Sequence, residues 1–283
     1  MPPNSQLVES FKQFIRERWA IHQLKAAGRP KPWTQDPILQ RYRFCNVRRE
    51  DDTVTRWIAD HWRAPHAKDP DLWFAMCVAR LVNWPDTLAE LDYPKAWDAD
   101  NFVTVLERRA AGREKVFSGA YIVSTNGHAM PKARYLAQHV LTPLWTRRQA
   151  IRPTVGDSLD SFHDRLWGQQ GMGPFMAAQV VADVKYVEPL KKASDWYTWA
   201  APGPGSKRGL NVVLGRAKDT PWGGGDKWLR ALRELIEQCT YDLEEAGVPR
   251  LHAQDYQNCL CEFDKYTRTS RGEGTPRSTY QGV

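Results

Sequence analysis

Two glycines lie between two helical patterns in the middle of the chain, where they could bring backbone amides to a phosphate. Residues 158–183 (SLDSFHDRLWGQQGMGPFMAAQVVAD) begin with apolar residues at helical spacing, and the pattern breaks at Gly168. Gly171 and Gly173 permit a tight hairpin, and Pro174 suits the first position of a second helix. Such a hairpin directs N–H groups and a helix N-terminus at one point, which favours binding of a DNA phosphate. The alternative is an ordinary corner between two packed helices.

A second candidate is a basic segment rich in glycine and proline, residues 200–210 (AAPGPGSKRGL). It holds two glycines around a proline, then a hydroxyl and two cations: Gly203, Gly205, Ser206, Lys207 and Arg208. We expect a loop whose exposed amides and cations bind a phosphate or pyrophosphate. The chain has no Walker A motif, which disfavours a nucleotide kinase of that class. A solvated surface loop is the alternative interpretation.

Two further segments combine side chains of opposite charge. Residues 44–52 (FCNVRREDD) carry an amide, two guanidiniums and a carboxylate in Asn46, Arg48, Arg49 and Asp52. Arginine forks suit bidentate contact with phosphate, although both arginines could equally pair with the neighbouring carboxylates at a solvated helix start. In residues 261–266 (CEFDKY), Glu262 and Lys265 share a helix face, and their spacing by default indicates a structural ion pair.

The histidines and cysteines indicate no metal site. The seven histidines lack metal-ligand spacing, and only His128, in Asn126-Gly127-His128, lies in a loop suited to chemistry. The five cysteines form no CxxC pair and no disulfide framework, which disfavours zinc and iron–sulfur sites. We therefore expect no metal and no other cofactor, and a reducing cytoplasm, that of a host cell if the protein is viral.

The composition is that of a globular protein with an anionic partner. The 283 residues are 42% hydrophobic and 26% charged, with a net charge of +7, which weakly favours nucleic acid. The 13 tryptophans either pack in a core or stack on bases. No apolar run approaches the roughly 20 residues of a membrane helix, and the N-terminus has no signal-peptide pattern, so we expect no membrane association.

Apolar periodicity predicts a mainly helical chain. We expect helices near residues 5–28, 52–58, 69–84, 132–145 and 228–247, a shorter apolar stripe over 256–263, and an extended stretch over 115–123. No alternation of strands and helices suggests a parallel sheet. We expect one helical catalytic and DNA-binding domain over residues 1–266, either undivided or with two lobes flanking a cleft. Residues 267–283 are expected to be a flexible polar tail.

Four segments together resemble one family of bacterial viruses. They are FCNVRREDDTV, FSGAYIV, GPFMAAQVVADVKY with APGPGSKRGL, and LCEFDKY, and the match spans roughly residues 41–268. They are similar to the alpha-glutamyl/putrescinyl thymine pyrophosphorylases, also called amino acid:DNA or amine:DNA transferases. The same helical domain accompanies the 5-hydroxymethyluridine DNA kinases. The resemblance implies a helical DNA-glycosylase-like architecture with a helix-hairpin-helix element.

The resemblance also implies a reaction and a set of site residues. An amino acid such as glycine, or a polyamine, would displace pyrophosphate from a modified thymine in double-stranded DNA. The positions carried over by motif are Asn46, Arg48, Asp52, Asp183, Gly203, Gly205, Arg208, Glu262 and Lys265. Lys132, Tyr121 and His128 are further candidates.

The residue types suit this chemistry. Arg208, Lys207 and Arg48 would neutralise the departing pyrophosphate, and Asp183 would take a proton from the amine or orient it. Asp183 could instead be a buried carboxylate with a structural role. Reaching the 5-methylene group favours flipping of the base, although that group also lies in the major groove.

Two other functions stay open. One is a non-catalytic DNA-binding partner of a 5-hydroxymethyluridine DNA kinase, and the other is a glycosylase that excises a modified base. Glycosylases place an aspartate some 20 residues beyond the hairpin, for which Asp195 is only a rough candidate.

Overall fold

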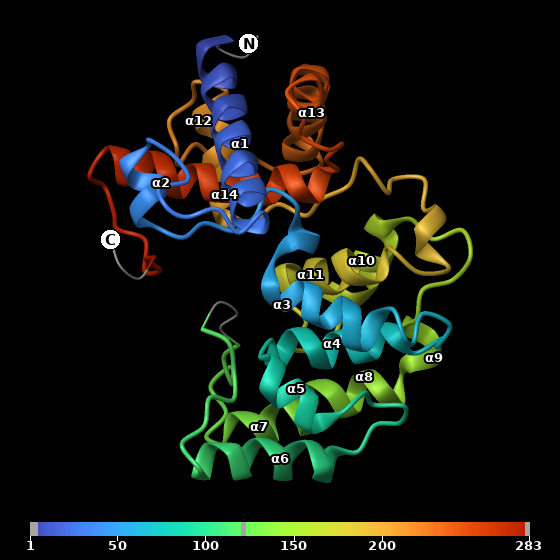
Figure 1. Cartoon of the computed structure of the whole chain (residues 1–283). Helices are drawn as coiled ribbons and strands as arrows, with labels where there is room; N and C mark the ends of the chain where they lie inside the picture. Colours follow the sequence, from blue (N-terminus) through green and yellow to red (C-terminus); the bar gives the residue numbers. More distant parts are fainter. Residues whose placement is uncertain (1–4, 120–122, 281–283) are drawn as a thin grey trace. The chain divides into compact units, whose positions relative to one another are not determined.

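The computed structural model describes residues 5–119 and 123–280 and is mainly helical, as predicted (Figure 1). Within these ranges there is no β-strand, and a single antiparallel bridge joins Tyr42 to Thr279. The chain divides into two compact units. Unit 1 comprises Met1–Asp52 and Tyr197–Val283, and unit 2 comprises Thr53–Trp196.

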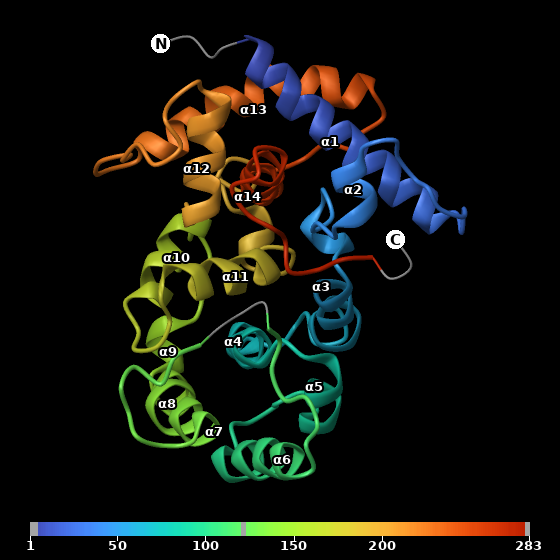
Figure 2. The same cartoon turned by 90° about the vertical axis from the view of Figure 1, so that its left-hand side faces the viewer.

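Unit 1 is built around one central helix, α14. Its elements are α1 (Ser5–Ala26), α2 (Pro37–Arg41), the 3-10 turn η1 (Arg49–Asp51), α12 (Pro204–Val213), α13 (Lys227–Glu245) and α14 (Ala253–Ser270). Helices α1, α12 and α13 pack around α14 (Figures 1 and 2). Phe11 and Ile15 from α1, Leu232 from α13 and Leu260 from α14 are fully buried in the shared core. The apolar repeats that predicted α1 and α13 therefore mark the faces that these helices bury.

Residues 267–280, in the segment expected to be a polar tail, continue α14 and then pair with residues 41–43. Helix α14 starts at Ala253 and continues to Ser270, past the expected boundary at residue 266. Beyond it, the Arg43 N–H donates to the Ser278 carbonyl at 2.9 Å, and the Tyr280 N–H donates to the Arg41 carbonyl at 3.0 Å. Tyr280 is buried. Backbone pairing and one buried aromatic ring thus hold a segment whose composition is that of a flexible tail.

Unit 2 surrounds α4, which is buried along its whole length. Its α-helices are α3 (Thr53–Ile58), α4 (Leu72–Val82), α5 (Pro85–Leu91), α6 (Ala99–Ala111), α7 (Lys132–Tyr135), α8 (Thr142–Thr146), α9 (Arg148–Ile151), α10 (Leu159–Trp167) and α11 (Pro174–Val184). The π-helical η2 (Ala59–Arg63) and η3 (Leu136–Leu141) and the 3-10 turn η4 (Leu190–Lys192) complete it. Helix α4 packs most closely against α11. Of the stretch predicted to be extended, the described residues 115–119 and 123 form no strand.

A buried ion pair joins α4 to α11. Asp183 is fully buried, and its two carboxylate oxygens accept hydrogen bonds from Nε and Nη2 of Arg80, both at 2.6 Å. Arg80 is 1% exposed and also donates to the side chains of Thr55 and Asn83. Two buried charges are tolerated here because the pairing is bidentate and each guanidinium nitrogen donates at least one hydrogen bond.

We predict that Asp183→Asn lowers the free energy of unfolding by about 3–5 kcal/mol, because it leaves the Arg80 guanidinium buried without a counter-charge. Chemical denaturation followed by tryptophan fluorescence measures the change. Asp60→Asn is the control, since Asp60 is exposed on η2; we expect it to stay within about 0.5 kcal/mol of the parent. Equal stability of the two variants would contradict a structural role for the pair.

Candidate functional site

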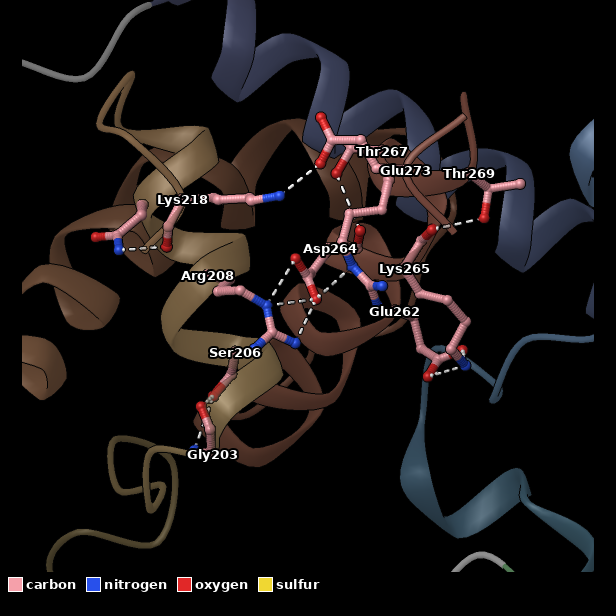
Figure 3. A network of polar contacts seen from close by, with 12 residues as sticks. Gly203, Ser206, Arg208, Lys218, Glu262, Asp264, Lys265, Thr267, Thr269 and Glu273 are labelled. Atoms are coloured by element: carbon pink, nitrogen blue, oxygen red, sulfur yellow. Dashed lines mark hydrogen bonds and ion pairs between the residues drawn. The ribbon is translucent and has the colours of Figure 1, made fainter. Parts of the chain in front are cut away.

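Three segments that the sequence singled out come together in unit 1 (Figure 3). They are the loop of residues 44–52, the start of α12 and the middle of α14. The Cys45 N–H in the loop donates to Oε2 of Glu262 on α14 at 3.0 Å. From α12, Arg208 Nη2 donates to Oδ2 of Asp264 on α14 at 2.9 Å. Helix α14 therefore carries side chains that hold both of the other segments.

The segment expected to be a phosphate-binding loop is instead the beginning of a helix. Residues 204–213 form α12, with Pro204 at its first position, where the missing N–H needs no helical partner. The Gly203 N–H donates to Oγ of Ser206 at 3.0 Å, and that hydroxyl donates to the Gly203 carbonyl. Ser206 is fully buried, so its hydroxyl serves the helix start. The loop prediction was wrong because glycine and proline here start and pack a helix.

Two glycines of α12 allow it to lie unusually close to α14. A Cβ atom on Gly205 would overlap with Sγ of Cys261, and one on Gly209 would overlap with the carbonyl oxygen of Leu260. On Gly203, by contrast, an added Cβ would meet its nearest atom, Nε2 of Gln257, at an ordinary contact distance of 3.6 Å. Gly205 is buried against α14 and has a packing role, whereas Gly203 stands at the helix start with space beside it.

One buried carboxylate orients two arginines. Asp264 is 1% exposed, and it accepts hydrogen bonds from Nε and Nη2 of Arg208 (Figure 3). It also accepts a hydrogen bond from Nε of Arg268 at 3.3 Å. The Arg208 side chain remains one-third exposed. Because one negative charge faces two positive ones, the cluster keeps a net positive charge. Sequence reasoning missed Asp264 and Arg268, although their four-residue spacing on a helix was a signal.

The ion pair expected between Glu262 and Lys265 is present. Lys265 Nζ lies 2.7 Å from both carboxylate oxygens of Glu262. Glu262 is buried, and through its bond to the Cys45 N–H it also fixes the loop. Lys265 Nζ lies 5.3 Å from the centre of the Phe44 ring, within the range of a cation–π contact. This pair therefore links α14 to the loop of residues 44–52.

Asp52 is a carboxyl group with an altered acidity. Burial raises its pKa to about 6, and the nearby negative charge of Glu262 contributes to the rise. A hydrogen bond from the Asn46 N–H to Oδ1, at 2.8 Å, and the positive charge of Arg49 act in the opposite direction. The Asn46 side chain donates to the Asp51 carbonyl at 2.8 Å and so shapes the same loop. Asp52 is thus ionised at neutral pH, yet readily protonated just below it.

The two arginines of the loop have carboxylate neighbours, as the alternative interpretation expected. Arg48 Nε lies 4.0 Å from Oδ2 of Asp51, and Arg49 Nη1 lies 3.8 Å from Oε1 of Glu50. Arg49 is buried, and its backbone N–H donates to Asp255 on α14 at 2.9 Å. Arg49 therefore anchors the loop, while the side chain of Arg48 is more exposed. Lys207, on α12, is also exposed.

The predicted hairpin belongs to unit 2, and its two helices are confirmed. Helix α10 ends at Trp167 and α11 begins at Pro174. Gly171 has a positive φ of 78°, and a Cβ there would overlap with the Val140 side chain, so only glycine fits. Gly173 is exposed, and an added Cβ would meet no atom within 4 Å. Packing therefore requires a glycine at position 171, whereas position 173 has room for a side chain.

The remaining candidates also lie in unit 2. Asp183 is enclosed in its ion pair with Arg80, which matches the structural alternative. Burial lowers the pKa of Lys132, whose Nζ lies 3.9 Å from the centre of the Phe117 ring. The centres of the His128 and His139 rings are 4.4 Å apart. Tyr121 lies outside the described residues.

Within residues 5–119 and 123–280, no group of three or more His, Cys, Asp and Glu side chains is arranged to hold a metal ion. In the same ranges, no helix has both the length and the apolar character needed to cross a membrane.

Residues 5–275 match the family described as the helical domain of 5-hmdU DNA kinases, and the chain belongs to this family. This confirms the part of the resemblance that concerned those kinases. A curated relative, the 5-hmdU DNA kinase of Bacillus phage SP10, is 26% identical over 210 residues. The match covers 66% of this chain and 33% of the relative, so the chain spans about a third of the protein it matches. No solved structure matches the chain.

We predict that Gly209→Ala lowers the free energy of unfolding by about 2–3 kcal/mol, because the added methyl group forces α12 away from α14. Alanine otherwise favours a helix interior over glycine by about 1 kcal/mol, so a loss reports the close contact. The matched control is Gly203→Ala, which we expect to cost at most about 1 kcal/mol. Urea denaturation of the full chain compares the two; stabilisation by Gly209→Ala would contradict the packing role.

Proposed function

We propose that the chain is a DNA thymine hypermodification transferase. In this reaction, an amine nitrogen attacks the 5-methylene carbon of 5-pyrophosphoryloxymethyl-deoxyuridine in DNA, the carbon–oxygen bond breaks, and pyrophosphate leaves. Family membership supports action on a 5-substituted uracil, because the relative in phage SP10 is named a 5-hmdU DNA kinase. The observation that carries the proposal is the convergence of two carboxylates and several cations on α14 of unit 1.

The cations suit a departing pyrophosphate. Negative charge grows on the leaving oxygens as the carbon–oxygen bond breaks, and fixed cations stabilise that charge. Arg208 is one-third exposed and is oriented by Asp264, so its position is set before the substrate arrives. Lys265 is held by Glu262 in the same way. Preorganisation of this kind stabilises the transition state without further rearrangement of the protein.

Asp52 is the better candidate for the proton acceptor. An amine attacks only in its neutral form, so a base must take its proton during or before attack. A carboxylate with a pKa of about 6 is ionised at neutral pH and is a stronger base than an ordinary aspartate. Asp183, by contrast, is fully buried with both oxygens bonded to Arg80. We therefore assign the proton transfer to Asp52 and a structural role to Asp183.

We propose that Asp52→Asn reduces transfer about 100-fold while leaving DNA binding intact. The assay supplies pyrophosphorylated DNA with glycine or putrescine and counts modified thymidine by mass spectrometry, together with the pyrophosphate released. The variant-to-parent rate ratio should rise with pH, because more of the amine is already neutral. Wild-type activity should fall as the pH drops through about 6, since Asp52 is then protonated.

An Asp183→Asn variant that still folds shows whether Asp52 or Asp183 is needed for transfer. Loss of transfer in that variant, with Asp52→Asn near normal, would reverse the assignment. Absence of pyrophosphate release by the wild-type protein would refute the transferase proposal as a whole.

DNA contact is proposed for the hairpin between α10 and α11. Gly173 is exposed at the start of α11 and has open space beside it, so a phosphate oxygen could approach its backbone closely. Trp167 and Phe175, which flank the turn, are each about half exposed, at 52% and 49%. Exposed aromatic rings beside a glycine turn favour a helix-hairpin-helix element that contacts nucleic acid.

We expect Gly173→Val to weaken binding of double-stranded DNA about 5-fold or more without loss of stability, because the side chain has room in the fold but blocks a phosphate. Binding should weaken to a similar extent for different DNA sequences, because the contact that is lost is to a backbone phosphate and not to a base. Gly224→Val in unit 1 is the control, since an added Cβ there also meets no atom. Fluorescence anisotropy with DNA of several sequences measures both; unchanged affinity would identify the turn as a packing corner.

A non-catalytic role as the DNA-binding partner of a 5-hmdU DNA kinase is the second candidate. It is favoured by the match to the helical domain of a much longer kinase. Base excision is less well supported, because both oxygens of Asp195 accept N–H groups at the start of α10, from Leu159 at 2.8 Å and from Asp160 at 3.1 Å. In the assay above, DNA binding without pyrophosphate release would favour the partner role, and abasic sites would favour excision.

A further inference from the structure

A small pocket on unit 1 is lined by three cations. Its volume is about 190 Å³, and its walls are the C-terminal half of α14 and the segment of residues 274–277 that follows it. Lys265, Arg268 and Arg277 line it together with Thr269, and no carboxylate belongs to the lining. A concave site with cations on several sides suits a compact anion.

The two cations on α14, Lys265 and Arg268, are each bonded to a carboxylate on the same helix. Lys265 on α14 bonds to Glu262 on the same helix; both residues are labelled in Figure 3. Arg268 donates through Nε to Asp264. Each charge is therefore oriented by a carboxylate that does not line the pocket. Asp264 also holds Arg208. These side chains are therefore ordered before any anion arrives, which lowers the entropic cost of binding.

The third cation is placed by the backbone of the C-terminal segment. Arg277 is exposed, and within the part of the chain that the structure describes it forms no ion pair. Next to it, the Ser278 carbonyl accepts the Arg43 N–H, and Thr279 pairs with Tyr42. A Cβ on Gly274, which also lines the pocket, would lie 3.2 Å from Arg268 Nη1, so this segment lies directly against α14.

The charge of the cluster calls for an anionic ligand. Lys265 pairs with Glu262, and Arg268 pairs with Asp264 and also feels the negative charge of Glu273. The pocket lining itself carries three cations and no carboxylate, so positive charge is in excess there. Guanidinium forks match the oxygens of a phosphate group in pairs, and Thr269 and Thr275 add hydroxyl groups to the lining.

We propose that Lys265, Arg268 and Arg277 form a binding site for a phosphate-type oxyanion. If the anion is the pyrophosphate group of the modified base, the site deepens the proposed transferase function by naming the residues that bind that group. In that case the proposal rests on the transferase function. A phosphodiester of the DNA backbone presents the same chemistry and is the other source. Neither Arg268 nor Arg277 was singled out by the sequence.

The test is binding of inorganic pyrophosphate to the full chain, measured by isothermal titration calorimetry. We expect Arg277→Ala to weaken binding at least about 5-fold, and Arg277→Lys to retain part of the affinity, because lysine keeps the charge but loses the fork. Arg29→Ala, which removes another exposed arginine of unit 1, is the matched control and should bind as the parent does. Equal unfolding midpoints would show that the loss is local.

A second arm identifies the source of the anion. The same variants are titrated with a double-stranded DNA oligonucleotide at several salt concentrations. Weaker pyrophosphate binding with unchanged DNA affinity supports a pyrophosphate site. Weaker DNA binding, with a salt slope reduced by about one, supports a backbone phosphate.

Unchanged affinity of Arg277→Ala for both ligands, or no binding of either ligand by the parent, would overturn the proposal. Neither arm requires turnover. A chain that binds the anion but transfers no amine would therefore refute the transferase function alone.

Discussion

The close contact between α12 and α14 is the constraint on which the candidate site depends. Gly205 and Gly209 remove the side chains that would otherwise separate the two helices. Only at this short distance can Arg208 on α12 share the carboxylate of Asp264 with Arg268, one turn further along α14. The electrostatics of the site therefore follow from a packing feature: without the two glycines, the buried carboxylate would lose one of its guanidinium partners.

Unit 2 also contains a buried carboxylate, but the charges around it are balanced differently. Its buried carboxylate, Asp183, pairs with the guanidinium of Arg80, and both side chains are shielded from solvent. The cluster on α14 instead combines a buried carboxylate with arginine side chains that are about one-third exposed. A fully enclosed and neutral pair stabilises packing, whereas a partly exposed and positively charged cluster can still receive a ligand.

Helices that follow from a local apolar repeat could be predicted from the sequence. Features that depend on contacts between residues far apart in the chain could not. Helices α1 and α13 carry long apolar repeats, and both were predicted close to their observed bounds. The segment that forms α12 was predicted to be a loop, because only the structure shows that Gly209 packs directly against Leu260 on α14. The pairing of Arg80 with Asp183 spans 103 residues and has no signature in a single sequence. The convergence of the loop with α12 and α14 was suggested only by the family resemblance.

Asp52 differs from Asp183 and Asp264, whose carboxylates are paired with arginine side chains. Its pKa is raised to about 6, so its protonated form stabilises the fold, and that contribution is lost as the pH rises through about 6. A shift of about two units from the ordinary aspartate value corresponds to at most about 3 kcal/mol, which the fold gives up at neutral pH. Asn would keep the hydrogen bond from the Asn46 N–H without that loss. The proton-transfer role proposed for Asp52 would account for a carboxylate that the fold retains at this cost in stability.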